Sequence, residues 1–246
     1  MAEPVQIYVL DKKVRLLQPA KGFRTSLDSV MLAAACQAGP GDRVLDMGCG
    51  VGGAAFCLLY RVKDCFITGI DNQQEYIDLA NKNTILNSDT ERCEFGCKDV
   101  RAFTVSGPKR RFDHAICNPP YLDSGQHTRS PDAGRAAALG HDDADMSVKD
   151  WIDAGFHLLK PGGSLTLIHR ADALDRILQA LGRRFGAVEI IPLWPHAGEA
   201  AKRIIVRARK DRKTPAILHP GLVLHDAKGK YTARADRILR GAKAIP

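Results

Sequence analysis

Residues 112–121, Phe-Asp-His-Ala-Ile-Cys-Asn-Pro-Pro-Tyr, combine residue types that suit group-transfer chemistry. The apolar run 115–117 predicts a buried strand, and it stops at two prolines, which lack the N–H that a sheet requires. Each proline also restricts the residue before it to extended geometry. The amide of Asn118 and the carbonyl of Pro119 are therefore expected to face one small space, with the ring of Tyr121 as a wall. Such a space suits a planar group that carries an NH2.

A strand that simply ends in a proline turn explains Asn-Pro alone. The longer pattern Asn118-Pro119-Pro120-Tyr121 after an apolar strand favours a functional site, provided that the chain also supplies a group donor. These four residues are the candidate catalytic residues. His114, within the predicted strand, and His141 are expected to have structural or RNA-contact roles.

The donor site is predicted at Gly48-Cys49-Gly50-Val51-Gly52-Gly53, which follows a strand at 43–46 and precedes an apolar helical run at 54–60. Strand, glycine turn and helix form the first unit of a doubly wound α/β sheet, in which a ligand binds at the turn. The six residues satisfy both G-x-G-x-G and G-x-G-x-x-G. The loop alone therefore does not separate a dinucleotide from S-adenosylmethionine.

Three acids at predicted strand ends separate these two ligands. Asp46 would face the doubly negative pyrophosphate of NAD unfavourably, whereas S-adenosylmethionine has a cationic sulfonium and ammonium and no phosphate. Asp71 suits the ribose hydroxyls, and Asp99 suits the adenine amino group or the support of its loop. A helix N-cap or a turn explains any one of these acids. The set favours S-adenosylmethionine, because ligands of such sheets bind at strand carboxyl ends.

The elements that position these residues alternate between strand and helix. We expect a hairpin over 6–18, a helix capped by Thr25 or Ser26, and strands and helices in the order given at the end of this paragraph. The alternation predicts a single domain of α/β class with a mostly parallel, doubly wound, Rossmann-like sheet and an antiparallel closing pair. Strands are expected at 43–46, 65–71, 93–99, 112–117, 164–168, 188–193, 202–208 and 216–224, and helices at 54–60, 73–86, 147–160 and 171–185.

Within this domain, residues 1–40 are expected to pack on a core formed by 41–210, and 211–246 to form a basic segment of the same domain. Residues 122–147 are rich in Gly, Ser, Asp, His and Ala and lack periodicity. A loop of that length in a compact domain is usually functional, so we expect a lid or a substrate-contacting loop.

Composition narrows the class of protein. The 246 residues, 45% of them hydrophobic, include neither a run of transmembrane length nor a signal-peptide core, so a soluble cytoplasmic protein without membrane contact is expected. The seven cysteines fit that reducing compartment. Cys93 and Cys97 form the only close pair and have no His or second pair at finger-like spacing, so no metal site is expected.

Positive charge gathers at the C-terminus. Residues 200–246 hold 13 Lys and Arg against three Asp, while the remaining 199 residues hold 23 basic and 25 acidic groups. Such blocks often face polyanions, so RNA is the expected partner. A solvated, partly mobile tail without a partner is the alternative.

Asp46-Met-Gly-Cys-Gly-Val-Gly, with the acids at 71 and 99 and Asn118-Pro-Pro-Tyr121, resembles the class I, Rossmann-like S-adenosylmethionine-dependent methyltransferases. In that class, Asn-Pro-Pro-Tyr marks the branch that methylates planar NH2 groups. The stretch Gly22-Phe-Arg-Thr-Ser-Leu-Asp28 and the turn Pro161-Gly-Gly are similar to the bacterial tRNA(Val) adenine N(6)-methyltransferase family. This resemblance covers roughly residues 5–210.

The resemblance implies methyl transfer from S-adenosylmethionine to adenine N(6) in tRNA, with S-adenosylhomocysteine as the product. It also implies that Thr25, with Arg24 near it, lines the methionine end of the cofactor. The basic residues of 200–246 and the loop 122–147 are the expected RNA contacts. The expected cofactor-binding residues are Arg24, Thr25, Asp46, Gly48, Cys49, Gly50, Asp71, Asn72, Asp99, Val100 and Asn118.

Four other functions fit parts of this pattern. A guanine amino methyltransferase acting on ribosomal RNA uses the same motif. So does a methyltransferase of the glutamine amide in a translation release factor, but that group generally carries a helical N-terminal module, and only about 40 residues precede the first core strand here. A non-catalytic RNA-binding protein on a methyltransferase fold is disfavoured by the intact glycine loop, the acids and Asn118. A nicotinamide oxidoreductase is disfavoured by Asp46.

Overall fold

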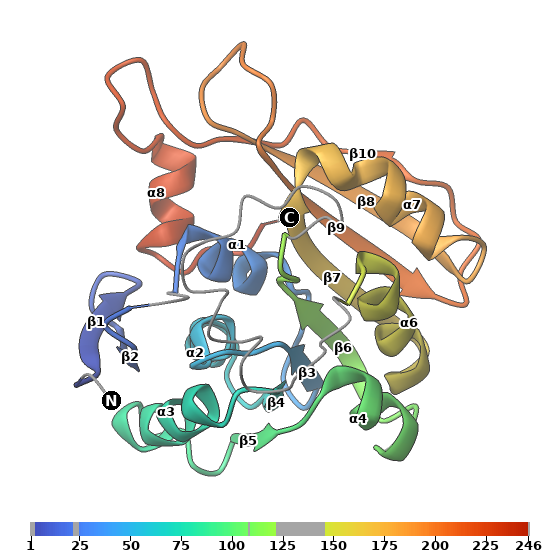
Figure 1. The fold of residues 1–246 in the computed structure, drawn as a ribbon. Coiled ribbons are helices and arrows are strands. Elements are labelled where there is room, and N and C mark those ends of the chain that lie inside the picture. The colour runs from blue at the N-terminus through green and yellow to red at the C-terminus, as the bar shows by residue number, and fades with distance from the viewer. Residues whose placement is uncertain (1–2, 22–24, 108, 122–145, 246) are drawn as a thin grey trace.

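The computed structural model describes residues 3–21, 25–107, 109–121 and 146–245. A nine-stranded sheet runs through the molecule in the order β10-β8-β9-β7-β6-β3-β4-β5, with β11 beside β8 (Figure 1). The strands are β1 (Val5–Val9), β2 (Val14–Gln18), β3 (Arg43–Met47), β4 (Phe66–Asp71), β5 (Cys93–Cys97), β6 (Phe112–Cys117), β7 (Leu159–Arg170), β8 (Phe185–Trp194), β9 (Arg203–Lys210), β10 (Ile217–Leu218) and β11 (Leu222–Val223). The helices are α1 (Leu27–Ala35), α2 (Gly53–Arg61), α3 (Gln74–Leu86), α4 (Val100–Ser106), α6 (Val148–Leu158), α7 (Leu174–Leu181) and α8 (Ala233–Leu239).

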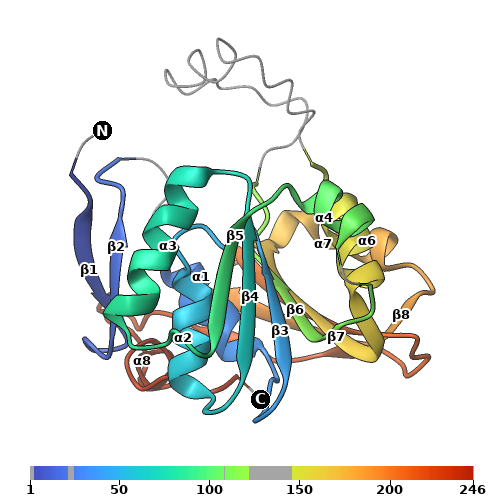
Figure 2. The same ribbon diagram turned by 90° about the horizontal axis from the view of Figure 1, so that it is seen from below.

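Strand direction confirms the predicted fold class. β5, β4, β3, β6 and β7 pair in parallel, and β9 runs antiparallel between β7 and β8. Helices cover both faces of this mostly parallel sheet, as expected for a doubly wound fold (Figure 2). β1 and β2 form the predicted hairpin. None of the helices in the described part of the chain is long and apolar enough to cross a membrane.

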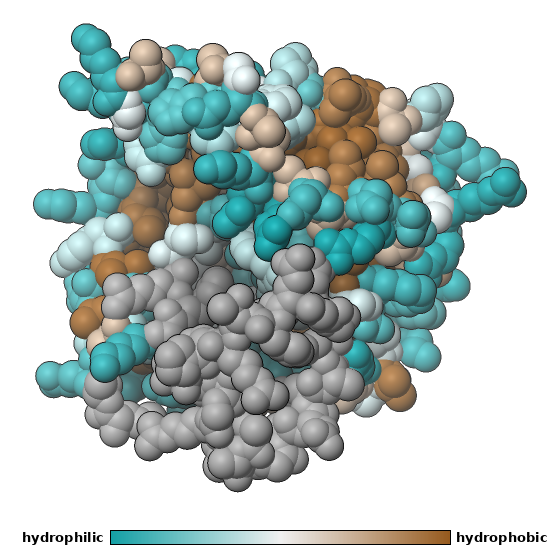
Figure 3. Space-filling model, turned by 45° about the horizontal axis from the view of Figure 1, so that its top comes forward, coloured by the Kyte–Doolittle hydropathy of each residue, from teal (hydrophilic) through white to brown (hydrophobic). Residues whose placement is uncertain are grey.

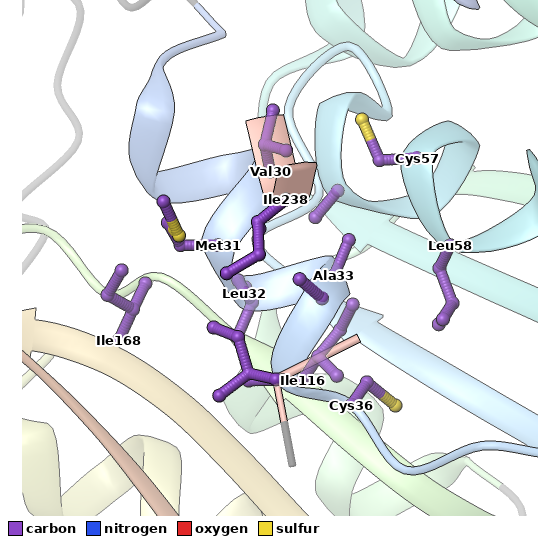
Figure 4. Packing of buried hydrophobic residues seen from close by; sticks show 14 of the residues in the cluster. Val30, Met31, Leu32, Ala33, Cys36, Cys57, Leu58, Ile116, Ile168 and Ile238 are labelled. Atoms are coloured by element: carbon purple, nitrogen blue, oxygen red, sulfur yellow. The ribbon is translucent and has the colours of Figure 1, made fainter. Parts of the chain in front are cut away.

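Two hydrophobic clusters lie on opposite faces of the sheet because side chains alternate along each strand. Val44 and Ile116 pack with α1, α2 and α8, whereas Leu45 and Ala115 pack with α4, α6 and α7. Figure 4 shows the first cluster, in which Ile238 of α8 lies beside side chains of α1. The C-terminal helix is therefore part of the core.

Asn83 of α3 connects the N-terminal hairpin to the glycine loop. Its fully buried side chain accepts from the N–H of Leu17 at 2.7 Å and donates to the carbonyls of Leu17 and Val51, both at 3.0 Å. A buried amide is stable only when its polar atoms are paired, so these bonds fix the hairpin against the loop.

The structure differs from the sequence-based expectation in several elements. α4 and α8 were not expected, α7 is shorter than the predicted 171–185, and two short strands, β10 and β11, replace the single strand predicted over 216–224. The predicted turn at Pro161-Gly-Gly lies inside β7, which already pairs at Leu159 with Phe112. Gly162 has a φ of +75°, and the pairing register shifts at this point, so the turn forms a bulge. Most of the predicted loop 122–147, residues 122–145 with His141, lies outside the described residues.

Apolar residues of the C-terminal segment pack on the core, although the Lys and Arg side chains of 211–246 are exposed. Ile245 is 5% exposed, and its N–H donates to the carbonyl of Ala34 at 2.8 Å. Arg207, also buried, donates to the carbonyls of Ala35 and Ile245 and forms an ion pair with Glu189. Lys210 is buried and donates to two carbonyls near the end of α6. Part of the positive charge in the sequence therefore joins elements of the core.

Replacing Ile238 by Ala tests whether the C-terminal helix stabilises the whole domain. Ile238 is 3% exposed, so Ile238→Ala is expected to reduce the free energy of unfolding by about 2–5 kcal/mol. Ile85→Ala, at a position that is 72% exposed, is the control and is expected to change it by less than about 1 kcal/mol. Urea unfolding measures both, and equal effects of the two substitutions would contradict the packing of α8.

Candidate cofactor and substrate site

The parallel register brings the predicted site residues to one edge of the sheet. Asp46 of β3 lies opposite Gly69 of β4 and Ile116 of β6, and Asp71 of β4 lies opposite Cys97 of β5. The residues that follow these strands, from Gly48, Asn72, Lys98 and Asn118 onward, therefore leave the sheet at its carboxyl edge. Ligands of such sheets bind at this edge.

The glycine loop is held against β4. The N–H groups of Gly48 and Cys49 donate to the carbonyl of Ile70 at 2.8 and 3.0 Å. Gly48 has a φ of +67°, and a Cβ there would lie 2.8 Å from the ring of Trp151. Glycine is thus required at 48 by both backbone conformation and close approach. Cys49 is buried, which raises the pKa of its thiol well above the ordinary value, so it remains a neutral thiol.

Asp71 is bound by backbone N–H groups. Its Oδ2 accepts from Gly50 at 2.9 Å and its Oδ1 from Gln73 at 3.0 Å. Burial raises the pKa of Asp71, while the N–H donors lower it. In the described structure this carboxylate joins the glycine loop to the segment after β4.

Asp46 is the least compensated group of the site. It is 2% exposed, and its Oδ2 has no hydrogen-bond partner among the described residues. Burial, together with the nearby charge of Asp71, raises the pKa of Asp46 to about 8, although the N–H of Ala55 lowers it. A buried carboxylate in this position favours either a proton or a cationic ligand.

The structure places the remaining predicted cofactor residues as follows. Asp99 is the N-cap of α4 and accepts from the N–H of Ala102 at 2.9 Å, which is the helix-cap interpretation of that acid. Val100 is the first residue of α4 and is buried. Asn72 is exposed directly after β4. In the described part of the chain, none of these three residues forms a side-chain hydrogen bond with Asp46.

Thr25 lies beside the start of α2. Its N–H donates to Oε1 of Gln18 at 3.1 Å, and a Cβ at Gly53 would lie 2.8 Å from its Oγ1. The segment before α1 therefore reaches the glycine loop. Arg24 lies outside the described residues.

A hollow of about 200 Å³ lies on the sheet beside α4, with Ile70, Lys98, Phe103 and Phe112 in its lining. None of the predicted cofactor residues lines this hollow. The candidate site therefore rests on strand ends, on hydrogen bonds and on the uncompensated Asp46.

Asn118 and Tyr121 lie together after β6. The hydroxyl of Tyr121 is 2.9 Å from Oδ1 of Asn118 and 2.8 Å from Oδ2 of Asp28. The Tyr121 ring is half-buried, with the guanidinium of Arg203 4.7 Å from its centroid and His169 edge-on at 5.0 Å. Tyr121 is therefore held by its neighbours rather than standing as a free wall. Pro119 is buried beside it and Pro120 is exposed.

Asp28 and Arg203 were not among the predicted site residues. Arg203, the first residue of β9, contacts Oδ2 of Asp28 through Nε at 3.1 Å. The sequence contains Asp28 in the stretch that resembles the tRNA methyltransferase family, but 175 positions separate it from Arg203. Only the three-dimensional pairing brings α1, β6 and β9 to one point.

His114 has a structural position. Its Nδ1 lies 2.7 Å from Oγ of Ser164 on β7, and its Nε2 lies 3.1 Å from Oδ2 of Asp42. The ring is buried, and burial lowers its pKa. His114 thus joins β6 to β7 and to the segment before β3. It lies in the first half of β6, whereas Asn118 follows the end of that strand. Among residues 3–21, 25–107, 109–121 and 146–245, no three His, Cys, Asp or Glu side chains form a group that could hold a metal ion.

Comparisons with known proteins identify the family of this chain. Residues 25–133 match the model of the methyltransferase small domain. The chain is 32% identical over 209 residues to the tRNA1(Val) (adenine(37)-N6)-methyltransferase of Vibrio campbellii, covering 85% of this chain and 84% of the relative. It is 27% identical over 231 residues to the enzyme of the same name from Shewanella baltica, covering 89% and 91%.

Solved structures lead to the same fold. The crystal structure of a predicted O-methyltransferase from Agrobacterium tumefaciens matches with a TM-score of 0.73 and 27% identity, covering 89% of this chain and 98% of that chain. The predicted Rossmann-like methyltransferase fold is confirmed. The chain belongs to the tRNA1(Val) (adenine(37)-N6)-methyltransferase family, and with it to the S-adenosylmethionine-dependent methyltransferases.

Proposed function

We propose that this enzyme methylates N(6) of adenine 37 in a tRNA(Val), using S-adenosylmethionine. The observation that carries the proposal is the position of Asn118, which leaves the sheet at the same edge as the uncompensated Asp46. A group that can hold an amino nitrogen thus lies beside a site that favours a cation. The choice of adenine 37 and of tRNA(Val) as the substrate follows the name of the Vibrio relative. The seven cysteines are free thiols, which supports action in the cytoplasm.

The residues present fit the cofactor. Asp46 needs a positive charge to offset its burial, and the cofactor carries a sulfonium and an ammonium. Asp71 and the loop of Gly48, Cys49 and Gly50 would hold the ribose and the methionine part, with Thr25 beside them. Asn72, Asp99 and Val100 would lie along the adenine. When bound, S-adenosylmethionine supplies an electrophilic methyl group, whose bonding electron pair stays on sulfur while the attacked nitrogen gains the methyl and then releases a proton to water.

Asn118 and Pro119 would prepare the amino group. The lone pair of an exocyclic adenine nitrogen is delocalised into the ring, so the group is a poor nucleophile. The side-chain oxygen of Asn118 and the carbonyl of Pro119 would each accept one N–H, which directs the nitrogen lone pair toward the donor side. Positioning and electrostatics then provide most of the catalysis. A strong general base is not required in this arrangement.

The RNA would contact the loop between β8 and β9 and the loop that follows β11. Lys202, Lys228 and Lys230 are exposed there, and the rings of His225 and Tyr231 stack with centroids 5.0 Å apart. Hydrophilic residues cover most of the described surface on this side of the molecule (Figure 3). Lysines that bind phosphates and aromatic rings that stack on unpaired bases are the usual features of single-stranded RNA sites.

These loops reach the candidate site. The segment from Trp194 to Lys202 ends at Arg203, whose guanidinium lies over the ring of Tyr121. In the same segment, the ring centroid of His196 lies 5.6 Å from that of His225, which precedes the loop with Lys228 and Lys230. A tRNA loop bound across 194–202 and 225–231 would therefore lie next to Asn118.

Replacing Asn118 by Ala tests the amino-group site. Asn118→Ala removes one acceptor and is expected to lower kcat for methyl transfer to tRNA by about 100-fold or more. The Kd for S-adenosylhomocysteine, measured by calorimetry, is expected to stay within about 3-fold. Wild-type turnover in this variant would exclude Asn118 from catalysis.

The pH dependence of stability tests Asp46. Its pKa is raised from 3.8 to about 8, so its contribution to the stability of the cofactor-free protein is present at low pH and is lost as the pH rises through about 8. The Tm of the cofactor-free wild type is therefore expected to fall between pH 6 and pH 8.5 more steeply than that of Asp46→Asn. Saturating S-adenosylmethionine is expected to reduce this fall in the wild type only. Identical pH profiles of the two proteins would show that Asp46 is not the uncompensated group.

The salt dependence of tRNA binding tests the basic loop. Lys228→Gln/Lys230→Gln is expected to lower the magnitude of the slope of log K against log salt by about 1–2, because each lost phosphate contact on a single strand removes about 0.7. Lys63→Gln/Lys109→Gln carries the same charge change on exposed lysines before β4 and β6, at the opposite edge of the sheet, and is expected to leave the slope unchanged. A deletion of 212–246 cannot replace this test, because it removes core residues such as Ile238 and Ile245.

A further inference from the structure

The hydroxyl of Tyr121 lies within hydrogen-bond distance of two acceptors. Oδ2 of Asp28 is 2.8 Å away and Oδ1 of Asn118 is 2.9 Å away. A phenol has one proton and donates one hydrogen bond. One of the two contacts must therefore be made in the opposite sense, with Tyr121 as the acceptor.

Charge decides which contact is reversed. Asp28 is buried and its Oδ2 also accepts the Nε–H of Arg203 in an ion pair, so this oxygen is an acceptor. A bond from the hydroxyl to this carboxylate is charge-assisted and stronger than a bond to a neutral amide. Burial, reinforced by the charge of Asp28, also raises the pKa of Tyr121, which keeps the proton on the phenol. Tyr121 therefore donates to Asp28.

Asn118 must then donate to Tyr121. The oxygen and nitrogen of a side-chain amide have nearly the same shape, and their placement follows from the hydrogen-bond partners. Because the hydroxyl of Tyr121 donates its proton in a hydrogen bond to Asp28, the amide of Asn118 turns its NH2 toward the phenol oxygen. Its oxygen becomes the atom that is free to accept from a substrate.

We propose that Asp28, acting through the hydroxyl of Tyr121, fixes the orientation of the Asn118 amide so that its oxygen faces the amino group to be methylated. This inference rests on the proposed function of Asn118. Asp28 and Tyr121 are positioning residues for the amide. Arg203 forms an ion pair with Asp28 and lies over the Tyr121 ring.

The opposite amide orientation would be unproductive. It would place the NH2 of Asn118 against the NH2 of adenine, so that two donors meet. In that orientation, the NH2 of Asn118 would instead donate to an oxygen at that position, such as the carbonyl oxygen of hypoxanthine. The network thus favours binding of an amino group over a carbonyl group. It also gives Asp28 a role at the substrate side of the site.

The test uses Tyr121→Phe, which keeps the ring and removes the hydroxyl, and Asp28→Asn, which keeps the size and removes the charge. The binding readout is the ratio of Kd values for two tRNA(Val) transcripts, one with hypoxanthine and one with adenine at position 37, in the presence of S-adenosylhomocysteine. Wild type is expected to prefer adenine by at least about 10-fold, since one mispaired buried polar contact has roughly that effect. Tyr60→Phe, a hydroxyl removal on α2, is the control and is expected to keep this ratio.

Both network variants are expected to reduce the adenine preference several-fold, with the Pro119 carbonyl retaining the rest. Both are also expected to lower kcat by about 10-fold or more, with KM for tRNA and the Kd for S-adenosylhomocysteine within about 3-fold of wild type. Wild-type preference in either folded variant would overturn the inference, whether or not kcat falls. If the wild type itself methylated guanine and not adenine, the proposed function would fail instead, so the two failures are distinguishable.

Discussion

Parallel pairing of β3, β4, β5 and β6 is the constraint on which the site depends. It brings Asp46, Asp71 and Asn118, which are far apart in the sequence, to one edge of the sheet. Side chains alternate along a strand, so a slip of one residue in the β3 register would exchange the faces of Leu45 and Asp46. The two hydrophobic clusters prevent such a slip, because Val44 and Leu45 pack on opposite faces. The same packing that stabilises the sheet therefore also aligns the acids with Asn118.

The burial of Asp46 has an energetic consequence for the cofactor. Burial raises the pKa of Asp46 to about 8, so its ionised form is disfavoured without a cation nearby, and a cation that binds there takes the place of the proton. A pyrophosphate would add a second negative group to the same place. The burial of this one acid thus supports the choice between S-adenosylmethionine and a dinucleotide that the glycine pattern left open.

Most strands of the sheet were predictable along the chain because buried parallel strands are short apolar runs bounded by turn residues. β6 was predicted with the bounds that the structure shows, and Asp46 and Asp71 lie at the edge of the sheet where the general rule expects ligands. α4 and α8 were not predictable in the same way, since each is only seven residues long and is stabilised by contacts that the sequence does not reveal. Ile238 of α8, for example, packs on α1, some 200 positions away along the chain.

Charged residues show the same limit. The basic C-terminal residues form one class in the sequence, but Arg207 and Lys210 are buried structural donors, Arg203 pairs with Asp28 beside Tyr121, and Lys228 and Lys230 are exposed. Tyr121 was expected as a wall for the base, and the structure adds a hydrogen-bonding role for its hydroxyl. Composition predicted a polyanionic partner, whereas the fold decides which cations are available to it.

The most direct measurement is nucleoside analysis of tRNA after reaction with isotopically labelled S-adenosylmethionine and the purified enzyme. The proposed function predicts labelled N(6)-methyladenosine in tRNA(Val) and no labelled methylguanosine or protein. Label in guanosine, or in a protein fraction with none in tRNA, would contradict it.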